Sequence, residues 1–184
     1  MNGSFGAKIF LCFVLLCPGL TWAASQALWG YPCDVFMSAA CLRLPNDMSI
    51  SYEVPADFGI YTVSRSGEAF LSIYVGSAPR LPDLARASLK LDAKGYKIRG
   101  FHSTVQDKER LDVIVLPTEK GGDVVHLFAR LSEDKRDAIA MVVAGLRLCS
   151  RPTPELVRCP LLSEPGKEIA DWVRAQRLSG APSP

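Results

Sequence analysis

Four short turn-forming segments divide the middle of this 184-residue chain into strand-sized pieces. They are Pro45-Asn46-Asp47, Pro55-Ala56-Asp57, Ser66-Gly67 and Gly121-Gly122-Asp123. The pieces that follow the first three turns are each long enough for one strand, and loops of a few residues join antiparallel neighbours. The sequence therefore predicts a three-stranded antiparallel meander, with strands over Ser49–Val54, Phe58–Ser64 and Ala69–Val75.

The apolar residues that follow this meander recur at a helical spacing. The pattern begins at Leu81 and extends to Leu91, with Pro82 suited to a first turn and Gly95 suited to a stop. We therefore expect a helix over residues 82–94.

Three more strands and two more helices are predicted in the second half of the chain. The helices begin after Ser132 and Ser163, which are good capping residues. The strands are expected over Tyr96–Val105, Leu111–Leu116 and Val124–Leu131. The fold class predicted from this order is α+β, with an antiparallel sheet of about six strands and two or three packed helices.

The first 23 residues have the features of an export signal. Lys8 gives a positive start, Ile9–Leu16 is an unbroken apolar run, and Thr21-Trp22-Ala23 places small residues at the cleavage positions. The apolar run is shorter than the roughly 20 residues that span a bilayer. We expect cleavage and no membrane insertion afterwards. Two alternatives are a cut after Ala27 and lipid attachment at Cys17, which the bulky residue before that cysteine disfavours.

Four cysteines remain after this leader, because Cys12 and Cys17 lie within it. They are Cys33, Cys41, Cys149 and Cys159. An even number of cysteines in an exported chain implies disulfides. We favour Cys33 with Cys41 and Cys149 with Cys159, because each pair closes a short loop that contains turn formers. The rival pairing joins Cys41 to Cys149. Zinc is disfavoured because no pair has the close spacing of structural sites, and no metal is predicted.

The chain therefore divides into four regions. A signal peptide over 1–23 precedes an N-terminal disulfide segment over 24–41 and an α+β domain over 42–148. Residues 149–184 form a disulfide loop, a C-terminal helix and a flexible tail. The segment "LRLPNDMSISYEVP", with the strands and helices that follow it, resembles the Mog1/PsbP-like fold over about 42–148. This resemblance implies an α+β sandwich that binds partners, and it supplies no catalytic residues.

The charge of the chain argues against nucleic acid as a partner. Without the leader it carries 20 basic and 19 acidic side chains, because Lys8 is lost, and the sequence shows no cluster of lysines and arginines. Nucleic-acid binding requires a basic surface.

The two histidines give little support for catalysis. His102 and Ser103 are neighbours on a predicted strand and therefore point to opposite faces. His126 alternates with Val124 and Phe128, which indicates a histidine packed within a sheet. The sequence contains neither a Gly-x-Ser-x-Gly nor a His-Glu-x-x-His motif. No catalytic residue and no cofactor are predicted.

Three acidic residues near a turn offer a second catalytic possibility. Asp107, Glu109 and Asp112 lie close together, and paired carboxylates can hydrolyse glycans. Lys108 and Arg110 are interleaved with them and neutralise the group. We interpret the acids as a solvated loop.

The best functional lead is the strand "FLSIYV". Its aliphatic side chains fall on one face, while Phe70, Ser72 and Tyr74 fall on the other. Tyrosine combines a large contact area with a polar tip, which suits interfaces. We therefore predict a partner-binding surface made of Tyr61, Phe70, Ser72, Tyr74, Gly76, Ser77 and Pro79.

These features predict an exported periplasmic or secreted protein that is not an enzyme and that binds or inhibits another protein. One specific form is an immunity protein against a toxin that acts in the periplasm. The partner is then a toxin or an envelope component. The alternatives are an envelope hydrolase and an accessory subunit of an envelope complex.

Overall fold

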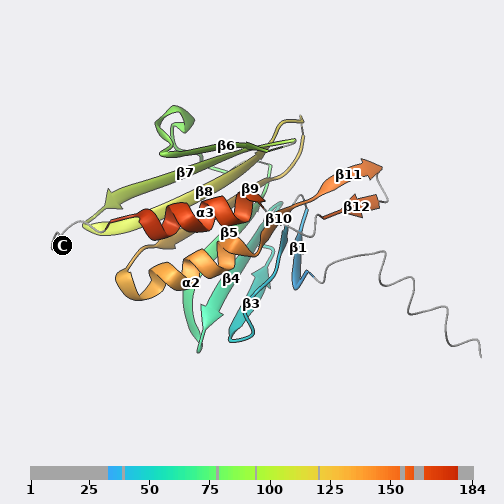
Figure 1. Ribbon diagram of the computed structural model, residues 1–184. Helices are drawn as coiled ribbons and strands as arrows, with labels where there is room; N and C mark the ends of the chain where they lie inside the picture. Colours follow the sequence, from blue (N-terminus) through green and yellow to red (C-terminus); the bar gives the residue numbers. More distant parts are fainter. Residues whose placement is uncertain are drawn as a thin grey trace, which may run out of the picture. The chain divides into compact units, whose positions relative to one another are not determined.

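The computed structural model describes residues 33–38, 40–77, 79–93, 95–119, 121–153, 156–159 and 164–177, which all belong to one compact unit. The predicted signal peptide, the predicted cap Ser163 and the predicted flexible tail lie outside these residues. The fold is α+β, as predicted, and its described residues form a large antiparallel sheet, a small sheet, a two-stranded ribbon and two α-helices (Figure 1).

Seven strands form the main sheet in the order β3-β4-β5-β9-β8-β7-β6, and every neighbouring pair is antiparallel. The predicted meander is confirmed as β3, β4 and β5. Its second hairpin turns at Ser66 and Gly67, which both have positive φ, as a tight two-residue turn requires. The strands are β3 (Met48–Glu53), β4 (Gly59–Arg65), β5 (Glu68–Gly76), β6 (Leu89–Ala93), β7 (Tyr96–Val105), β8 (Lys108–Pro117) and β9 (Val124–Arg130).

The helix predicted over residues 82–94 is wrong. The segment forms one 3-10 turn, η1 (Leu84–Arg86), and then strand β6, which pairs with β7. The apolar residues also alternate with Lys90 and Asp92, and this two-residue period is the one that the sheet uses. Gly95 has a φ of 83° and turns the chain into β7 instead of ending a helix.

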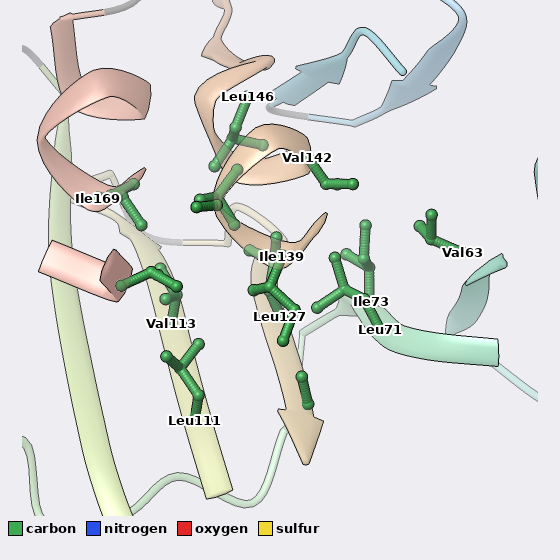
Figure 2. Packing of buried hydrophobic residues seen from close by; sticks show 14 of the residues in the cluster. Val63, Leu71, Ile73, Leu111, Val113, Leu127, Ile139, Val142, Leu146 and Ile169 are labelled. Atoms are coloured by element: carbon green, nitrogen blue, oxygen red, sulfur yellow. The ribbon is translucent and has the colours of Figure 1, made fainter. Parts of the chain in front are cut away.

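Both helices, α2 (Glu133–Ala144) and α3 (Glu164–Ala175), pack beside each other on one face of the main sheet (Figure 1). Ser132 has the extended backbone of a helix cap, but its side chain makes no capping hydrogen bond. Figure 2 shows Ile139 of α2 and Ile169 of α3 among strand side chains such as Val113 and Leu127, and all four are fully buried. This layer of helix and strand side chains is the main hydrophobic core.

A small sheet joins the first described strands to the segment that follows α2. It has the order β1-β2-β10, with β1 (Val35–Met37), β2 (Ala40–Leu42) and β10 (Leu146–Leu148). Strand β2 lies in the middle and is entirely buried. The ribbon β11 (Ser150–Thr153) and β12 (Leu156–Arg158) follows directly.

The predicted disulfide pairing is confirmed. Cys33 is bonded to Cys41 and Cys149 to Cys159, with Cα–Cα distances of 5.7 and 4.2 Å. The two disulfides are neighbours, because the sulfur atoms of Cys33, Cys41 and Cys159 lie within 4.8 Å of one another. The pairing of β2 with β10 explains this proximity, since it places Ala40 opposite Leu148.

Candidate functional site

The strand register assigns each side chain of the main sheet to one of two faces, because directly paired residues point to the same side. The face under α2 and α3, called here the helix face, includes the cross-strand row Tyr61, Ile73, Leu127 and Val113. The opposite face, called the second face, includes the row Thr62, Ser72, Phe128 and Asp112 and the row Ile60, Tyr74, His126 and Ile114.

One half of the second face is covered by the segment that precedes β6. Ala87, Leu81 and Leu84 pack there against Phe101 and Ile114 in a small second core. The apolar residues that suggested a helix in the sequence therefore serve to cover the sheet over β7 and β8.

The other half of the second face, formed by β3, β4, β5 and β9 with the adjoining Arg110 of β8, is called here the open face. Thr62, Ser72, Tyr74 and Phe128 are half-buried on it, and the outward side chains of the edge strand β3 are exposed. Both described helices lie on the helix face. The open face is therefore a regular surface of hydroxyl and aromatic side chains.

The structure does not bring all the predicted partner-binding residues together on one face. Ser72 and Tyr74 share the open face, as expected. Tyr61 is on the helix face, because it pairs with Ile73, so it does not join them. The register shift after Val63 leaves Phe70 without a partner on β4, and its side chain is only 8% exposed. The expectation of one continuous exposed surface is wrong for Tyr61 and Phe70.

Tyr61 and Gly76 instead line a cavity of about 400 Å³ at one end of the sheet. Tyr52 stacks on Tyr61 with ring centroids 4.4 Å apart, and the Tyr61 hydroxyl donates to Phe36 O at 3.5 Å. Burial, and then the neighbouring Tyr52, raise the pKa of Tyr61. Beyond β5, Ser77 is exposed and Pro79 is half-buried.

Tyr74 lies close against the sheet, because Gly76 has no side chain. A Cβ atom at Gly76 would meet the Tyr74 hydroxyl oxygen at 2.6 Å. Phe58 packs beside the Tyr74 ring, with centroids 5.2 Å apart. These contacts fix the ring in place while part of it stays exposed.

A buried charged cluster borders the open face. Asp112 is 6% exposed and His126 is 7% exposed, and His126 Nε2 lies 2.8 Å from Asp112 Oδ1. Arg110 donates to the same carboxylate from Nε at 2.9 Å and from Nη2 at 2.8 Å. The interpretation of Asp112 as a solvated loop residue is wrong, because β8 begins at Lys108 and carries Asp112 inside the sheet.

The electrostatics of this cluster favour an ionised Asp112. Burial alone raises the pKa of Asp112, but the hydrogen bonds from His126 and Arg110 outweigh burial and hold the pKa below its usual value. An ionised carboxylate only accepts hydrogen bonds, so Nε2 of His126 carries the shared proton. The hydrogen bonds to Asp112 in turn raise the pKa of Arg110.

The cluster positions the guanidinium group of Arg110 at the surface. This group lies over the Phe128 ring, 5.6 Å from its centroid, and the side chain is 44% exposed. The sequence does contain a signal for the cluster, because Arg110 and Asp112 are two residues apart on one strand and share a face. The sequence alone does not show that His126, on the adjoining strand, lies beside Asp112, because this depends on the strand register.

The other histidine, His102, is on the helix face and Ser103 is on the second face, so the two point to opposite faces, as predicted. His102 pairs with Leu111, and Ser103 pairs with Arg110. His102 Nε2 lies 2.9 Å from Glu109 Oε2.

Comparisons with family models, with curated proteins and with solved structures found no match. In the part of the chain that the structure describes, neither helix has the length and apolarity needed to cross a membrane. The two disulfides are consistent with a protein outside the cytoplasm.

Proposed function

We propose that this chain is an exported binding protein that presents its open face to a protein partner. The observation that carries this proposal is the open face itself, where Ser72, Tyr74 and Phe128 are half-buried on a rigid sheet. Aromatic residues with polar tips contribute much of the energy of protein interfaces, and a rigid surface loses little entropy on binding. The resemblance to the Mog1/PsbP-like family, which implies partner binding, supports the same function.

The specific form that we propose is an inhibitor in the periplasm, such as an immunity protein against a toxin that acts there. Two disulfides beside a small sheet suit an oxidising compartment. A sheet face of hydroxyl and aromatic side chains suits occlusion of another folded protein. An accessory subunit of an envelope complex would use the same face with a permanent partner.

An envelope hydrolase is the second candidate function, and the Asp112–His126 pair is the observation that favours it. A carboxylate that orients a histidine is one part of a nucleophilic site. Within the described residues, however, His126 forms its hydrogen bond with Asp112, and Asp112 also binds Arg110. We therefore assign the pair to positioning Arg110.

Photo-crosslinking in the periplasm tests the proposal. A photoreactive amino acid is placed at Thr62 or Ser72 on the open face, and at Met141 or Lys167, which are exposed on the helices. We expect one protein to be crosslinked from both open-face positions and from neither helix position. Equal capture from the helix positions would contradict the assignment of the face.

The captured protein is then purified, and its affinity for the wild type and for Tyr74→Ala is measured. A tyrosine at the centre of an interface contributes about 2 kcal/mol or more of binding free energy. An immunity role further requires that the wild-type chain protects cells that express the captured protein in the periplasm. Loss of protection by Tyr74→Ala, at an unchanged protein level, is the expected result.

A further inference from the structure

A cavity at one end of the open face gathers basic side chains that are separated in the sequence. It has a volume of about 490 Å³, and its lining includes four basic residues from β8, β9 and α2, namely Lys108, Arg110, Arg130 and Lys135. The sequence shows no cluster of this kind, because the four residues meet only through strand pairing and the start of a helix.

The register places two of these cations directly opposite each other. Arg110 pairs with Arg130 across β8 and β9. Like charges in this position repel, and the usual arrangement is a pair of opposite charges. The fold therefore places two positive charges side by side in the lining of the cavity.

Part of this charge is balanced within the protein. Arg110 binds Asp112, and Lys135 donates to Glu68 at 2.5 Å. Glu109, the acidic residue in the lining, lies 2.9 Å from His102 Nε2. Among the described residues, neither Lys108 nor Arg130 takes part in an ion pair.

Arg110 is prepared to bind an anion. Its Nε and Nη2 atoms bond to Asp112, while Nη1 makes none of these bonds. A guanidinium group has five N–H donors, so donors remain after the Asp112 contacts are made. Because the Asp112 bonds and the Phe128 ring hold the group in place, little conformational entropy is lost when it binds a carboxylate.

The cavity also has an apolar part. Phe128 and Phe70 form part of its wall, and Val105 at its rim is 49% exposed. An exposed valine beside a cationic pocket favours a ligand with both an anionic group and an apolar group. A free inorganic anion would leave this apolar surface uncovered.

We propose that this cavity binds an acidic side chain and the apolar residue next to it in a segment of the protein partner. The inference rests on the proposed function, since it names the part of the partner that reaches the open face. Arg110 and Arg130 bind the carboxylate, Lys108 and Lys135 supply further positive charge, and Val105 and Phe128 contact the apolar residue.

The test is an NMR titration of the full chain with a blocked peptide, acetyl-Leu-Glu-Glu-Leu-amide. A matched peptide with glutamine in place of both glutamates is the control. We expect shifts of the backbone signals of residues 108–110 and 128–130 with the glutamate peptide, at an affinity at least about tenfold above that of the control, as loss of a charge-assisted hydrogen bond implies.

Two matched variants test the assignment to residues. Arg130→Gln removes a cavity cation that makes no ion pair among the described residues, so the fold should be retained. This variant should bind the glutamate peptide with an affinity about tenfold lower than that of the wild type. Lys97→Gln makes the same change of charge at an exposed strand position outside the cavity and should leave the affinity unchanged. Equal weakening by both variants would show a nonspecific charge effect and overturn the proposal.

Other ligands give distinct outcomes. Equal binding of acetate or inorganic phosphate would indicate a site for free anions, and sedimentation with phosphatidylglycerol vesicles would indicate a membrane surface; either result overturns the proposal. If the peptide fails to bind while Thr62 and Ser72 still crosslink one protein, the cavity assignment fails and the proposed function stands. Peptide binding without such crosslinks supports the cavity and contradicts the open-face function.

Discussion

The helix face and the open face are built from alternate residues of the same strands, yet they have different chemistry. On β5 and β9 the side chains of Ile73 and Leu127 are fully buried under the helices, whereas Ser72 and Phe128 on the opposite side are half-buried. The helix face is aliphatic and needs cover, because exposed aliphatic surface is costly in water. The open face combines hydroxyl groups with aromatic rings, which tolerate water and also suit a partner.

A second contrast lies within the second face. The part over Phe101 and Ile114 is covered by Leu81, Leu84 and Ala87. The half over β4 and β5 contributes Thr62 and Ser72. Among the described residues, the covering segment therefore packs on aliphatic and aromatic side chains, and Thr62 and Ser72 lie on the half that it does not reach.

The largest expected effect comes from removing an aliphatic side chain on the helix face. Ile73→Ala leaves a cavity in the main core and should lower the free energy of unfolding by about 2–5 kcal/mol. Its neighbour on the other face, Ser72→Ala, should change that free energy by only about 0.5 kcal/mol. Urea denaturation of both variants measures the difference. A cost above 2 kcal/mol for Ser72→Ala would mean that the open face is core.

Each disulfide should contribute roughly 2–4 kcal/mol by restricting the unfolded chain. Replacing Cys33 and Cys41 together by serine affects β1 and β2, which pack into the core of the helix face. We expect a lower free energy of unfolding with unchanged partner affinity. Non-reducing peptide mapping of the wild type checks the pairing itself, and a peptide that joins Cys41 to Cys149 would contradict it.

Asp112→Asn tests the buried cluster at the border of the open face. The variant leaves Arg110 without its charged partner and weakens the bond to His126, so a loss of about 1–3 kcal/mol in the free energy of unfolding is expected. Because Arg110 is then less well positioned, the affinity for the acidic peptide should fall as well. Unchanged peptide affinity would show that the cluster has only a structural role.

The pH dependence of stability gives an independent test of Asp112. Because the folded state lowers its pKa, the carboxylate contributes stability above its unfolded pKa of about 4, and this contribution is lost as the pH falls through the folded value. The difference in unfolding free energy between wild type and Asp112→Asn should therefore shrink from pH 7 to pH 2. A difference that stays constant over this range would contradict the lowered pKa.

A small effect on folding is expected for Tyr74 of the open face, compared with Tyr61 of the helix face. Tyr61→Ala removes a ring that packs against the main core, whereas Tyr74→Ala removes one that is half-buried beside Phe58. We expect Tyr74→Ala to cost about 1 kcal/mol of stability or less, and Tyr61→Ala to cost more. Melting curves of both variants provide the measurement. If Tyr74→Ala lowers the stability more than Tyr61→Ala does, the assignment of Tyr61 to the core and of Tyr74 to the open face is contradicted.

The fold class and the disulfides could be predicted from the sequence because they depend on local signals. Turn residues such as Ser66 and Gly67 end strands by their own conformational preferences. The segment over residues 82–94 could not be assigned, because its leucines satisfy both a helical and a strand period. The segment becomes a strand because it pairs with the edge of β7, and this pairing is not visible in the sequence.

The candidate site required the register between strands. Alternation within one strand correctly placed Ser72 and Tyr74 together, but it cannot relate them to Tyr61 on the next strand. A shift of one residue in pairing moves a side chain to the other face. For the same reason, the sequence does not show that Arg110 and Arg130 lie opposite each other. They are 20 residues apart in the sequence and are paired only across β8 and β9.

The pairing of β2 with β10 also sets an order of events for the newly made chain. The two strands are separated by roughly 100 residues, so their contact forms late compared with the local hairpins of the main sheet. Until β10 arrives, the apolar strand Ala40–Leu42 has an unpaired edge, and such edges promote aggregation. A chain that crosses a membrane from its N-terminus would carry this edge until Leu146–Leu148 emerges. Efficient production should therefore depend on a chaperone that shields the edge during that interval.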